Sequence, residues 1–314
     1  MKKHWLLLTN DDGIEEPVFL ELVESLNKQG YPIVVFAPAK NHSATGMRLS
    51  LGTPMKFANR SDLKSRMDLD ENTELHMFSL DGTPCDCIIT ALDGGMKLKL
   101  PGIIPAMVVS GINVGPNLSQ DSWHSGTMAA AREAGLYGMP AIATSWSSFN
   151  PEGIKIGIEA TIELVQKALN ILPHEAVNIG RSKVDTTLDY LASWPNESVM
   201  AEPIIGLQNA FRNGDIMLNL NVPTDWNRKF KSTRLGMRWY RNAVNFVGDE
   251  STFTLGASSI DYTKVENGDC DADAAGFASI SVLPNWPQTH PLAVDEKLLA
   301  WNLVNSDEMP CWIQ

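Results

Sequence analysis

The sequence predicts an α/β protein with a doubly wound, mostly parallel sheet and a C-terminal β-rich extension. Two continuous apolar runs, residues 5–8 and 33–36, have the pattern of central strands that are covered on both faces. Between them, residues 17–30 place apolar side chains at helical spacing. A strand, a helix and a second strand in this order favour a parallel pair. A third apolar run at residues 107–109 extends the pattern.

The size and charge of the chain exclude several classes of partner. Its 314 residues are 44% hydrophobic, as expected for one large globular domain with an extension. The chain has 25 Lys and Arg against 37 Asp and Glu, and therefore a formal net charge of −12. Because such a chain repels phosphate groups at long range, we expect neither a nucleic acid polymer nor a membrane among its partners.

The cysteines and the N-terminus predict a cytoplasmic protein. The four cysteines, Cys85, Cys87, Cys270 and Cys311, are sparse for this length and lack the paired spacing of a zinc site. The N-terminal Met-Lys-Lys leads directly into a short apolar run without a cleavage site. No segment approaches the ~20 apolar residues of a membrane span, and we expect reduced thiols.

The region after the second strand is less regular. Spaced apolar residues between 49 and 57 predict short strands, and the charged segment 61–73 predicts a surface excursion. Residues 75–80 (LHMFSL) predict another strand. Pro84 then stands at the first position of a helix that is expected to continue to residue 92.

A glycine- and asparagine-rich segment at 110–117 (SGINVGPN) predicts a compact loop after the third strand. Further on, Ser-Gly-Thr at 125–127 precedes an alanine-rich helical run. This arrangement fits plain helix capping, and it also fits an anion site at the positive end of the helix dipole. A strand at 141–144 and an amphipathic helix at 154–171 complete the predicted core.

The remaining chain divides into an expected insertion at 172–203, which has three prolines and many polar residues, and a β-rich part. We place a catalytic domain at 1–230 and the extension at 231–314. The acidic run at 269–273 lacks the glycine and glutamate of a calcium loop, and we expect an exposed turn there. The predicted elements are strands at 215–222, strands or hairpin arms at 233–240, 246–255 and 278–283, and a helix at 294–304.

Polar loops follow the predicted parallel strands, and a doubly wound sheet would bring these loops to one edge. Asp11 and Asp12 follow the first strand, Ser43 lies after the second, and Asn113 lies after the third. Their oxygen atoms suit Mg²⁺, Mn²⁺ or Ca²⁺ rather than zinc or copper. The alternatives are helix capping by the carboxylates and hydrogen bonds from the other two to their own backbone. With an anion site nearby, the set indicates metal-assisted hydrolysis of a phosphate ester.

Sequence blocks in a fixed order support this interpretation. They are TNDDG at 9–13, APAKNHSATG at 37–46, DGTPCDC at 81–87, SGINVGPN at 110–117, SGTMAAAREAGLYGMPAIATS at 125–145, LNLNVP at 218–223, TRLG at 233–236, and a pattern from Asp269 to Pro284. The blocks cover nearly the whole chain and resemble the SurE family of survival-protein nucleotidases. The resemblance implies a Rossmann-like core and a C-terminal extension used to assemble a homodimer or homotetramer.

The resemblance also implies an activity and a set of site residues. The activity is that of a divalent-metal-dependent phosphatase acting on nucleoside 5′- and 3′-monophosphates, with exopolyphosphatase activity as a further expectation. The ligands of one Mg²⁺ or Mn²⁺ ion (Ca²⁺ in a crystal) would be Asp11, Asp12, Ser43 and Asn113, with Asp11, Asp12 and Asn113 in catalysis. The phosphate site would comprise Ser125, Gly126, Thr127 and Asn117, with Gly111 shaping it.

Some positions depart from the family pattern and bear on substrate preference. Ala44 stands where the family usually has glycine, and Glu15 and Glu16 add negative charge near the site. The Ser-Trp-His stretch at 122–124 replaces a more aromatic one. His42 and His124 flank the motifs and could protonate a leaving alcohol, although the family motif requires neither.

Other functions remain as alternatives. A phosphatase of the haloacid dehalogenase type needs Asp-x-Asp after the strand, and Gly13 stands two residues after Asp11. A metal-bound nucleotide sensor without turnover would keep the same ligand set, as would a phosphatase with a non-nucleotide phosphomonoester substrate.

Overall fold

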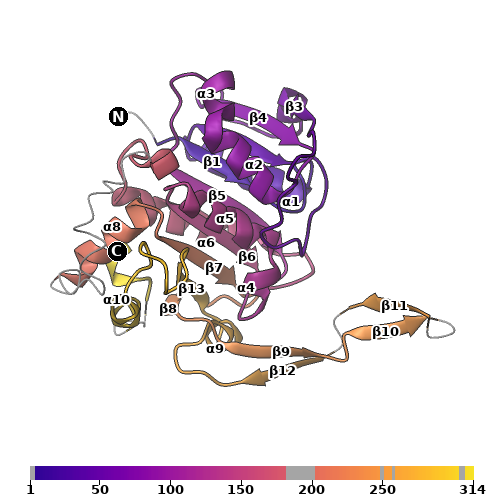
Figure 1. Cartoon of the computed structure of the whole chain (residues 1–314), viewed down its shortest axis with the longest axis vertical. Helices are drawn as coiled ribbons and strands as arrows, with labels where there is room; N and C mark the ends of the chain where they lie inside the picture. Colours follow the sequence, from indigo (N-terminus) through magenta and orange to yellow (C-terminus); the bar gives the residue numbers. More distant parts are fainter. Residues whose placement is uncertain (1–3, 182–201, 248–250, 257–258, 304–307) are drawn as a thin grey trace.

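A nine-stranded sheet with the order β3-β4-β2-β1-β5-β6-β7-β13-β8 forms the centre of the computed structural model (Figure 1). The structure describes residues 4–181, 202–247, 251–256, 259–303 and 308–314. Six neighbouring strands, from β4 to β7, run parallel, and this confirms the predicted fold class. The strands of the sheet are β1 (Leu6–Thr9), β2 (Ile33–Pro38), β3 (Phe57–Asn59), β4 (Leu75–Leu80), β5 (Met107–Val114), β6 (Ala141–Trp146), β7 (Ile216–Val222), β8 (Phe230–Thr233) and β13 (Ala278–Pro284).

The first strand lies where the direction of winding changes. β2 pairs with one side of β1 and β5 with the other, both in parallel. The loops that follow these three strands therefore leave the sheet at the same edge. In doubly wound sheets, ligands bind at this position, because the loops on either side of the switch point diverge and leave room between them.

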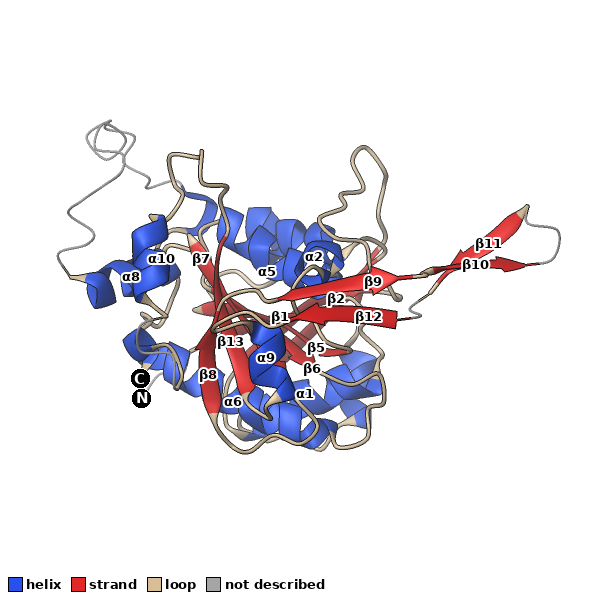
Figure 2. Ribbon diagram, turned by 90° about the horizontal axis from the view of Figure 1, so that it is seen from below, coloured by secondary structure: helices blue, strands red, loops and turns tan. Residues whose placement is uncertain are grey.

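Helices cover both faces of the sheet (Figure 2). α1 (Pro17–Lys28) and α6 (Ile154–Asn170) lie on one face, and α2 (Pro84–Thr90) and α5 (Gly126–Leu136) lie on the other. Side chains of a strand alternate between faces, so Leu6 and Leu8 pack into the core beneath α1 and α6, whereas Leu7 packs beneath α2 and α5. Both faces of β1 are thus apolar, as its continuous hydrophobic run predicts.

Two predicted segments differ from the structure. The short strands expected between residues 49 and 57 reduce to β3 at the end of that segment; Leu51 is 83% exposed and packs on no strand. The loop expected at 110–117 begins later, because β5 continues to Val114. Gly111 is accommodated in the strand by an irregularity in the pairing of β5 with β6 between Ser110 and Asn113.

The C-terminal part adds strands to the main sheet and also forms two separate pairs of strands outside it. β13 pairs antiparallel with β7 and parallel with β8, so the strand predicted at 278–283 lies in the main sheet. In contrast, β9 (Met237–Arg241) pairs with β12 (Ser259–Thr263), and β10 (Val244–Val247) pairs with β11 (Thr252–Leu255). These two pairs form a long projection, which we call the arm; it comprises residues 237–247, 251–256 and 259–263 (Figure 1).

The last segments pack against the body. α8 (Pro203–Arg212), α10 (Glu296–Trp301) and the short helix η5 (Cys311–Ile313) lie together, with the rings of Phe211 and Trp312 5.5 Å apart. Most of the insertion expected at 172–203 falls outside the described residues, and the division at residue 230 stays a prediction. Among the described helices, none is long and apolar enough to cross a membrane.

The acidic run at 269–273 is a correction. It forms α9 (Asp269–Ala274), and Asp269 is 0% exposed, so the exposed turn expected there is wrong. Asp269 accepts hydrogen bonds from the amides of Ser119 and Gly236, which lie far away in sequence. Burial of this carboxylate is compatible with folding because backbone donors surround it.

Candidate metal and phosphate site

The turn after β1 is built by its own asparagine. The buried Asn10 donates from Nδ2 to the Gly13 carbonyl at 2.8 Å and accepts from the Gly13 amide at 3.3 Å. Gly13 has φ +116°, and a Cβ there would lie 3.2 Å from the carbonyl carbon of Lys40. The turn after β1 therefore packs directly against the loop after β2. The amide of His42 strengthens this contact by donating to the Asp11 carbonyl at 2.7 Å.

Asp11 lies against the N-terminus of α5. Its carboxylate is 3% exposed and accepts a 2.6 Å hydrogen bond at Oδ1 from the Thr127 hydroxyl. A Cβ at Gly126 would come within 2.8 Å of the Asp11 Cβ, so glycine is needed for this approach. Burial raises the pKa of the Asp11 carboxyl, and hydrogen bonds from Thr127 and the amides of Thr127 and Gly126 lower it in part.

Asp12 faces the loop after β2. Its Oδ1 accepts from Asn41 Nδ2 at 3.1 Å and lies 3.4 Å from Ser43 Oγ. Burial raises the pKa of the Asp12 carboxyl to about 7, with further contributions from the charges of Asp11 and Glu16. The neighbouring Glu15 adds less negative charge to the site, because ion pairs with Arg60 and Arg66 offset its charge.

The negative charge at this edge has no protein partner among the described residues: no Lys or Arg forms a salt bridge with Asp11 or Asp12. The described part of the chain also has no cluster of three His, Cys, Asp or Glu of the kind that holds a metal. The donor set here is instead two carboxylates with hydroxyl and amide oxygens. Such oxygens fit a hard divalent cation, whose charge would offset both the burial of the Asp12 carboxylate and its repulsion by Asp11.

Asn113 reaches the same edge through an extra residue in β5. The pairs Ser110–Ala143 and Asn113–Ser145 enclose three steps on β5 but only two on β6. Gly111 has φ +127°, and a Cβ there would meet the Thr144 carbonyl oxygen at 2.3 Å, so only glycine fits this bulge. Asn113 Nδ2 donates to the Gly115 carbonyl at 2.7 Å, which orients its Oδ1 away from that bond.

Asn117 is fixed by polar residues of the neighbouring strands. Its amide donates to Asn221 Oδ1 at 2.7 Å, its carbonyl accepts from Asn219 Nδ2 at 2.9 Å, and its Nδ2 donates to Ser145 Oγ at 2.8 Å. Asn219, Asn221 and Ser145 are 0% exposed. The sequence pattern predicts a strand at 215–222 but not this role of its asparagines.

Ser125 begins α5 by accepting a 3.0 Å hydrogen bond at Oγ from the amide of Met128. The capping role that was one of the two alternatives is therefore present. Gly126 and Thr127 lie directly beside Asp11, so the structure brings together the 125–127 segment, Asp11, Asp12 and Ser43 by contact. Asn113 and Asn117 join them at the same edge through β5 and the loop that follows it.

The two histidines differ in their surroundings. His42 is partly buried, and burial and the charges of Lys40 and Arg48 lower the pKa of its imidazole. Its Nε2 has no hydrogen-bond partner among the described residues. His124 is exposed, and its carbonyl accepts from the amide of Gly46 at 2.8 Å, which joins the loop after β2 to the segment before α5. Among the described residues, neither ring forms a hydrogen bond or ion pair with Asp11 or Asp12.

Comparisons with known proteins agree with this arrangement. The family model described as "Survival protein SurE" matches residues 6–242. A protein of Syntrophotalea carbinolica named 5′-nucleotidase SurE is 31% identical over 283 residues, covering 88% of this chain and 90% of its own. A protein of Carboxydothermus hydrogenoformans with the same name is 32% identical over 288 residues, covering 89% of each. The crystal structure of the SurE protein from Aquifex aeolicus aligns with a TM-score of 0.62 at 25% identity, covering 91% of this chain and 95% of that one.

Proposed function

This chain belongs to the SurE family, and from that premise we propose that it is a phosphoric monoester hydrolase that acts on nucleoside 5′-monophosphates. The proposal extends to nucleoside 3′-monophosphates and to short polyphosphate as further substrates. One observation carries it: the buried Asp11 lies against the N-terminus of α5, the partly buried Asp12 lies next to it, and neither carboxylate has a cationic partner among the described residues, at the switch point of the sheet.

We assign a divalent cation, Mg²⁺ or Mn²⁺, to Asp11, Asp12, Ser43 and Asn113. When bound there, such a cation would polarise a water molecule and the phosphoryl oxygens of the substrate. The support is the chemistry of the donors, all of them oxygen, and the pKa of Asp12, which burial and the neighbouring charge of Asp11 raise.

The protein residues hold the reactants in place. Thr127 donates to Asp11 and so fixes the rotamer of a carboxylate that has little room to move. The start of α5 places the positive end of a helix dipole beside Asp11, and this favours a phosphate group there. Asn117, held from three sides, limits the movement of the loop between β5 and α5. Because the site is preorganised, less free energy is lost on ordering it when substrate binds.

Phosphate release from a panel of nucleoside 5′- and 3′-monophosphates and short polyphosphate tests the proposal. The assay is run in Mg²⁺ or Mn²⁺, with and without a chelator. We expect release from nucleotides that the chelator abolishes. Release only from non-nucleotide phosphomonoesters would assign a different substrate class. Nucleotide binding without release, with each metal, would overturn hydrolysis and identify a nucleotide sensor.

We also propose that the arm assembles a homodimer or homotetramer. Its exposed side chains include Phe246 at 63%, Phe253 at 57% and Leu255 at 77% exposure. Phe246 and Phe253 face each other across β10 and β11 with ring centroids 6.1 Å apart, and so form one apolar patch. Apolar patches on a projecting hairpin are typical of a protein interface. A cytoplasmic location completes the proposal, supported by four cysteines that form no disulfide.

A further inference from the structure

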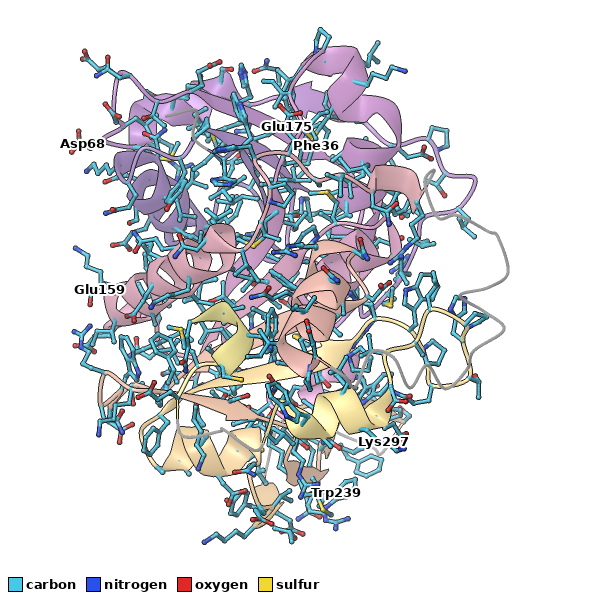
Figure 3. The ribbon with its side chains drawn as sticks, turned by 90° about the vertical axis from the view of Figure 1, so that its left-hand side faces the viewer. Phe36, Asp68, Glu159, Glu175, Trp239 and Lys297 are labelled. Carbon is cyan, nitrogen blue, oxygen red and sulfur yellow. The ribbon has the colours of Figure 1, made fainter. Side chains whose placement is uncertain are left out.

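The root of the arm turns two polar side chains toward the body of the protein. Along β9, Arg238 is buried and Tyr240 is partly buried, whereas the intervening Trp239 is 44% exposed. Because alternate residues of a strand point to opposite faces, Arg238 and Tyr240 lie on the same, inward face. Figure 3 shows the labelled Trp239 at the periphery of the molecule. The inward face is polar, so the arm is not attached by apolar packing alone.

Both inward side chains bind Asp121, in the short helix α4 (Asp121–His124). Arg238 forms an ion pair with the Asp121 carboxylate, and the Tyr240 hydroxyl donates to Asp121 Oδ1 at 2.6 Å. Arg238 Nη2 also donates to the Tyr240 hydroxyl at 2.8 Å. We call these three residues the Asp121 cluster. Both members of its ion pair are 9% exposed, so water screens their interaction little.

A second connection lies beside the first. The Ser119 amide donates to Asp269 Oδ2 at 3.0 Å, and its hydroxyl donates to the Gly236 carbonyl at 2.9 Å while accepting from the Arg238 amide at 3.2 Å. Asp269 Oδ1 accepts from the Gly236 amide at 2.7 Å. Gly236 precedes the outgoing strand of the arm, and Asp269 follows the returning one. Both sides of the root therefore hold residue 119.

The segment held in this way leads directly to the phosphate site. Ser119 and Asp121 lie between Asn117 and Ser125, and the Ser125 amide donates to the Asp121 carbonyl at 2.9 Å. Ser125 caps α5, and Thr127, two residues later, donates to Asp11. A short path of hydrogen bonds and intervening backbone thus joins Arg238 in the arm to the carboxylate of Asp11 in the candidate metal site.

The ion pair is not arranged for stability alone. Arg238 Nε has no hydrogen-bond partner among the described residues. A buried ion pair loses hydration that its own attraction only partly replaces, and apolar residues of similar size often stabilise a fold as well. An ion pair does fix direction and distance more sharply than apolar contacts, and those are the properties that a site segment requires.

We propose that Asp121, Arg238 and Tyr240 are positioning residues through which the root of the arm holds residues 117–127 in the geometry that the phosphate site requires. This inference rests on the proposed function of that site. It deepens the proposed function, because the attachment of the arm to the body would then affect the rate of turnover. Binding of a second copy to the arm would then change the geometry of the site, although no hydrogen bond or ion pair among the described residues joins the arm to Asp11, Asp12 or Ser125.

The test is Arg238→Met, which replaces the aliphatic part of the side chain with an unbranched apolar one and removes the guanidinium group with its charge. Two measurements are made on the full chain: hydrogen exchange of the amides at 117–127, and kcat and KM for adenosine 5′-monophosphate in Mn²⁺. We expect faster exchange in this segment and a kcat lower by about tenfold to a hundredfold per folded molecule. Arg238→Lys should recover part of the loss, because it restores the positive charge.

The control is Arg241→Met on the same strand. Arg241 is paired with Asp261 on the exposed surface at 2.8 Å, so its loss removes an equal charge without touching the Asp121 cluster. It should change neither measurement. Tyr240→Phe, which removes one hydroxyl from the cluster, should give an intermediate effect.

Two results would overturn the inference. One is a lower melting temperature of Arg238→Met with an unchanged kcat per folded molecule, since a merely structural ion pair predicts that. The other is unchanged exchange at 117–127. If the wild-type chain released no phosphate from any nucleotide, the proposed function would fail. The exchange data and the dissociation constant for inorganic phosphate in Mn²⁺ would then still decide the positioning role.

Discussion

Folded proteins usually pair their buried charges and bury their large apolar side chains. The edge of the sheet around Asp11 and Asp12 departs from the first rule, and the outer part of the arm departs from the second. At the edge, the buried Asp11 and the partly buried Asp12 have no cationic partner among the described residues. On the arm, the paired aromatic side chains of Phe246 and Phe253 remain exposed to water. Burial of an uncompensated charge and exposure of large apolar groups both cost free energy. We infer that each region is completed from outside the chain, the edge by a cation and the arm by a second copy.

The two regions also differ in how they are held. The site is fixed by hydrogen bonds between segments that are distant in sequence, as with Asn117 and Asn221, which are 104 residues apart. The arm is held along its length by pairing between its own strands, and it contacts the body mainly at its root. A change at the site should therefore alter chemistry with little effect on assembly, and a change at the tip of the arm should do the reverse.

The largest effect is expected from Asp12→Asn. It removes a ligand charge, and kcat should fall about a thousandfold or more. The metal-free protein should nevertheless melt at a temperature at least as high as the wild type, because a neutral side chain avoids the repulsion from Asp11. Calorimetry and phosphate release measure the two quantities. Wild-type turnover by the Asp12→Asn protein would show that the active site does not lie at this edge of the sheet.

The next effect is a dependence of metal affinity on pH. The pKa of Asp12 is raised to about 7 from the ordinary 3.8, so the carboxyl is protonated below pH 7 and a cation must displace that proton. The dissociation constant for Mn²⁺ should increase about tenfold for each pH unit below 7. Titration calorimetry at several pH values measures it. A constant affinity from about pH 5.5 to pH 7.5 would show that Asp12 is not a ligand.

The sign for stability follows from the same pKa. Between pH 3.8 and about 7, the folded metal-free chain binds more protons at Asp12 than the unfolded chain does. Its free energy of unfolding should therefore decrease as pH rises through this window. In Asp12→Asn this part of the decrease should be absent, and thermal melting of both proteins across the window makes the comparison.

A smaller effect is expected at the arm. Replacement of Phe246 and Phe253 by serine should raise the dissociation constant for self-association at least about tenfold, because central aromatic side chains dominate most interfaces. The melting temperature of the isolated chain should change little, since both rings are exposed. Thr254→Ala, on the other face of the same hairpin, serves as the control. Light scattering over a range of concentrations would contradict the proposal if the double variant assembled as the wild type does.

The smallest effect is expected at Asp68, a surface charge that is both solvent-exposed and paired. Asp68 pairs with Lys28 at 2.7 Å, but its side chain is 87% exposed, and it lies at the surface in Figure 3. Asp68→Asn should leave turnover, assembly and melting temperature within the error of measurement, because water screens such pairs. A large shift in any of these would show that surface charge contributes more to this acidic chain than the comparison assumes.

The sequence was sufficient for the elements whose pattern is local. The run at residues 5–8 is apolar throughout, and such a run is compatible only with burial on both faces, as β1 has. Ser125 and the alanines after it specify the start of α5 by capping and helix propensity. For residues 110–114 the local pattern predicts a loop, because Gly111 and Asn113 are typical of loops, whereas the structure continues β5 there. The hydrogen bonds that keep them in the strand come from β6.

The sequence by itself determined the doubly wound core and the polar residues that follow its strands, because hydrophobic periodicity and strand order already place those loops at one edge. Only the tertiary structure showed what holds them: Asn10 and Asn41 beside the carboxylates, and Asn221 behind Asn117. It also showed the root of the arm bound to Asp121. These contacts join residues whose separation carries no periodic signal, and an asparagine or an aspartate in a sequence does not indicate which distant backbone group it will bind.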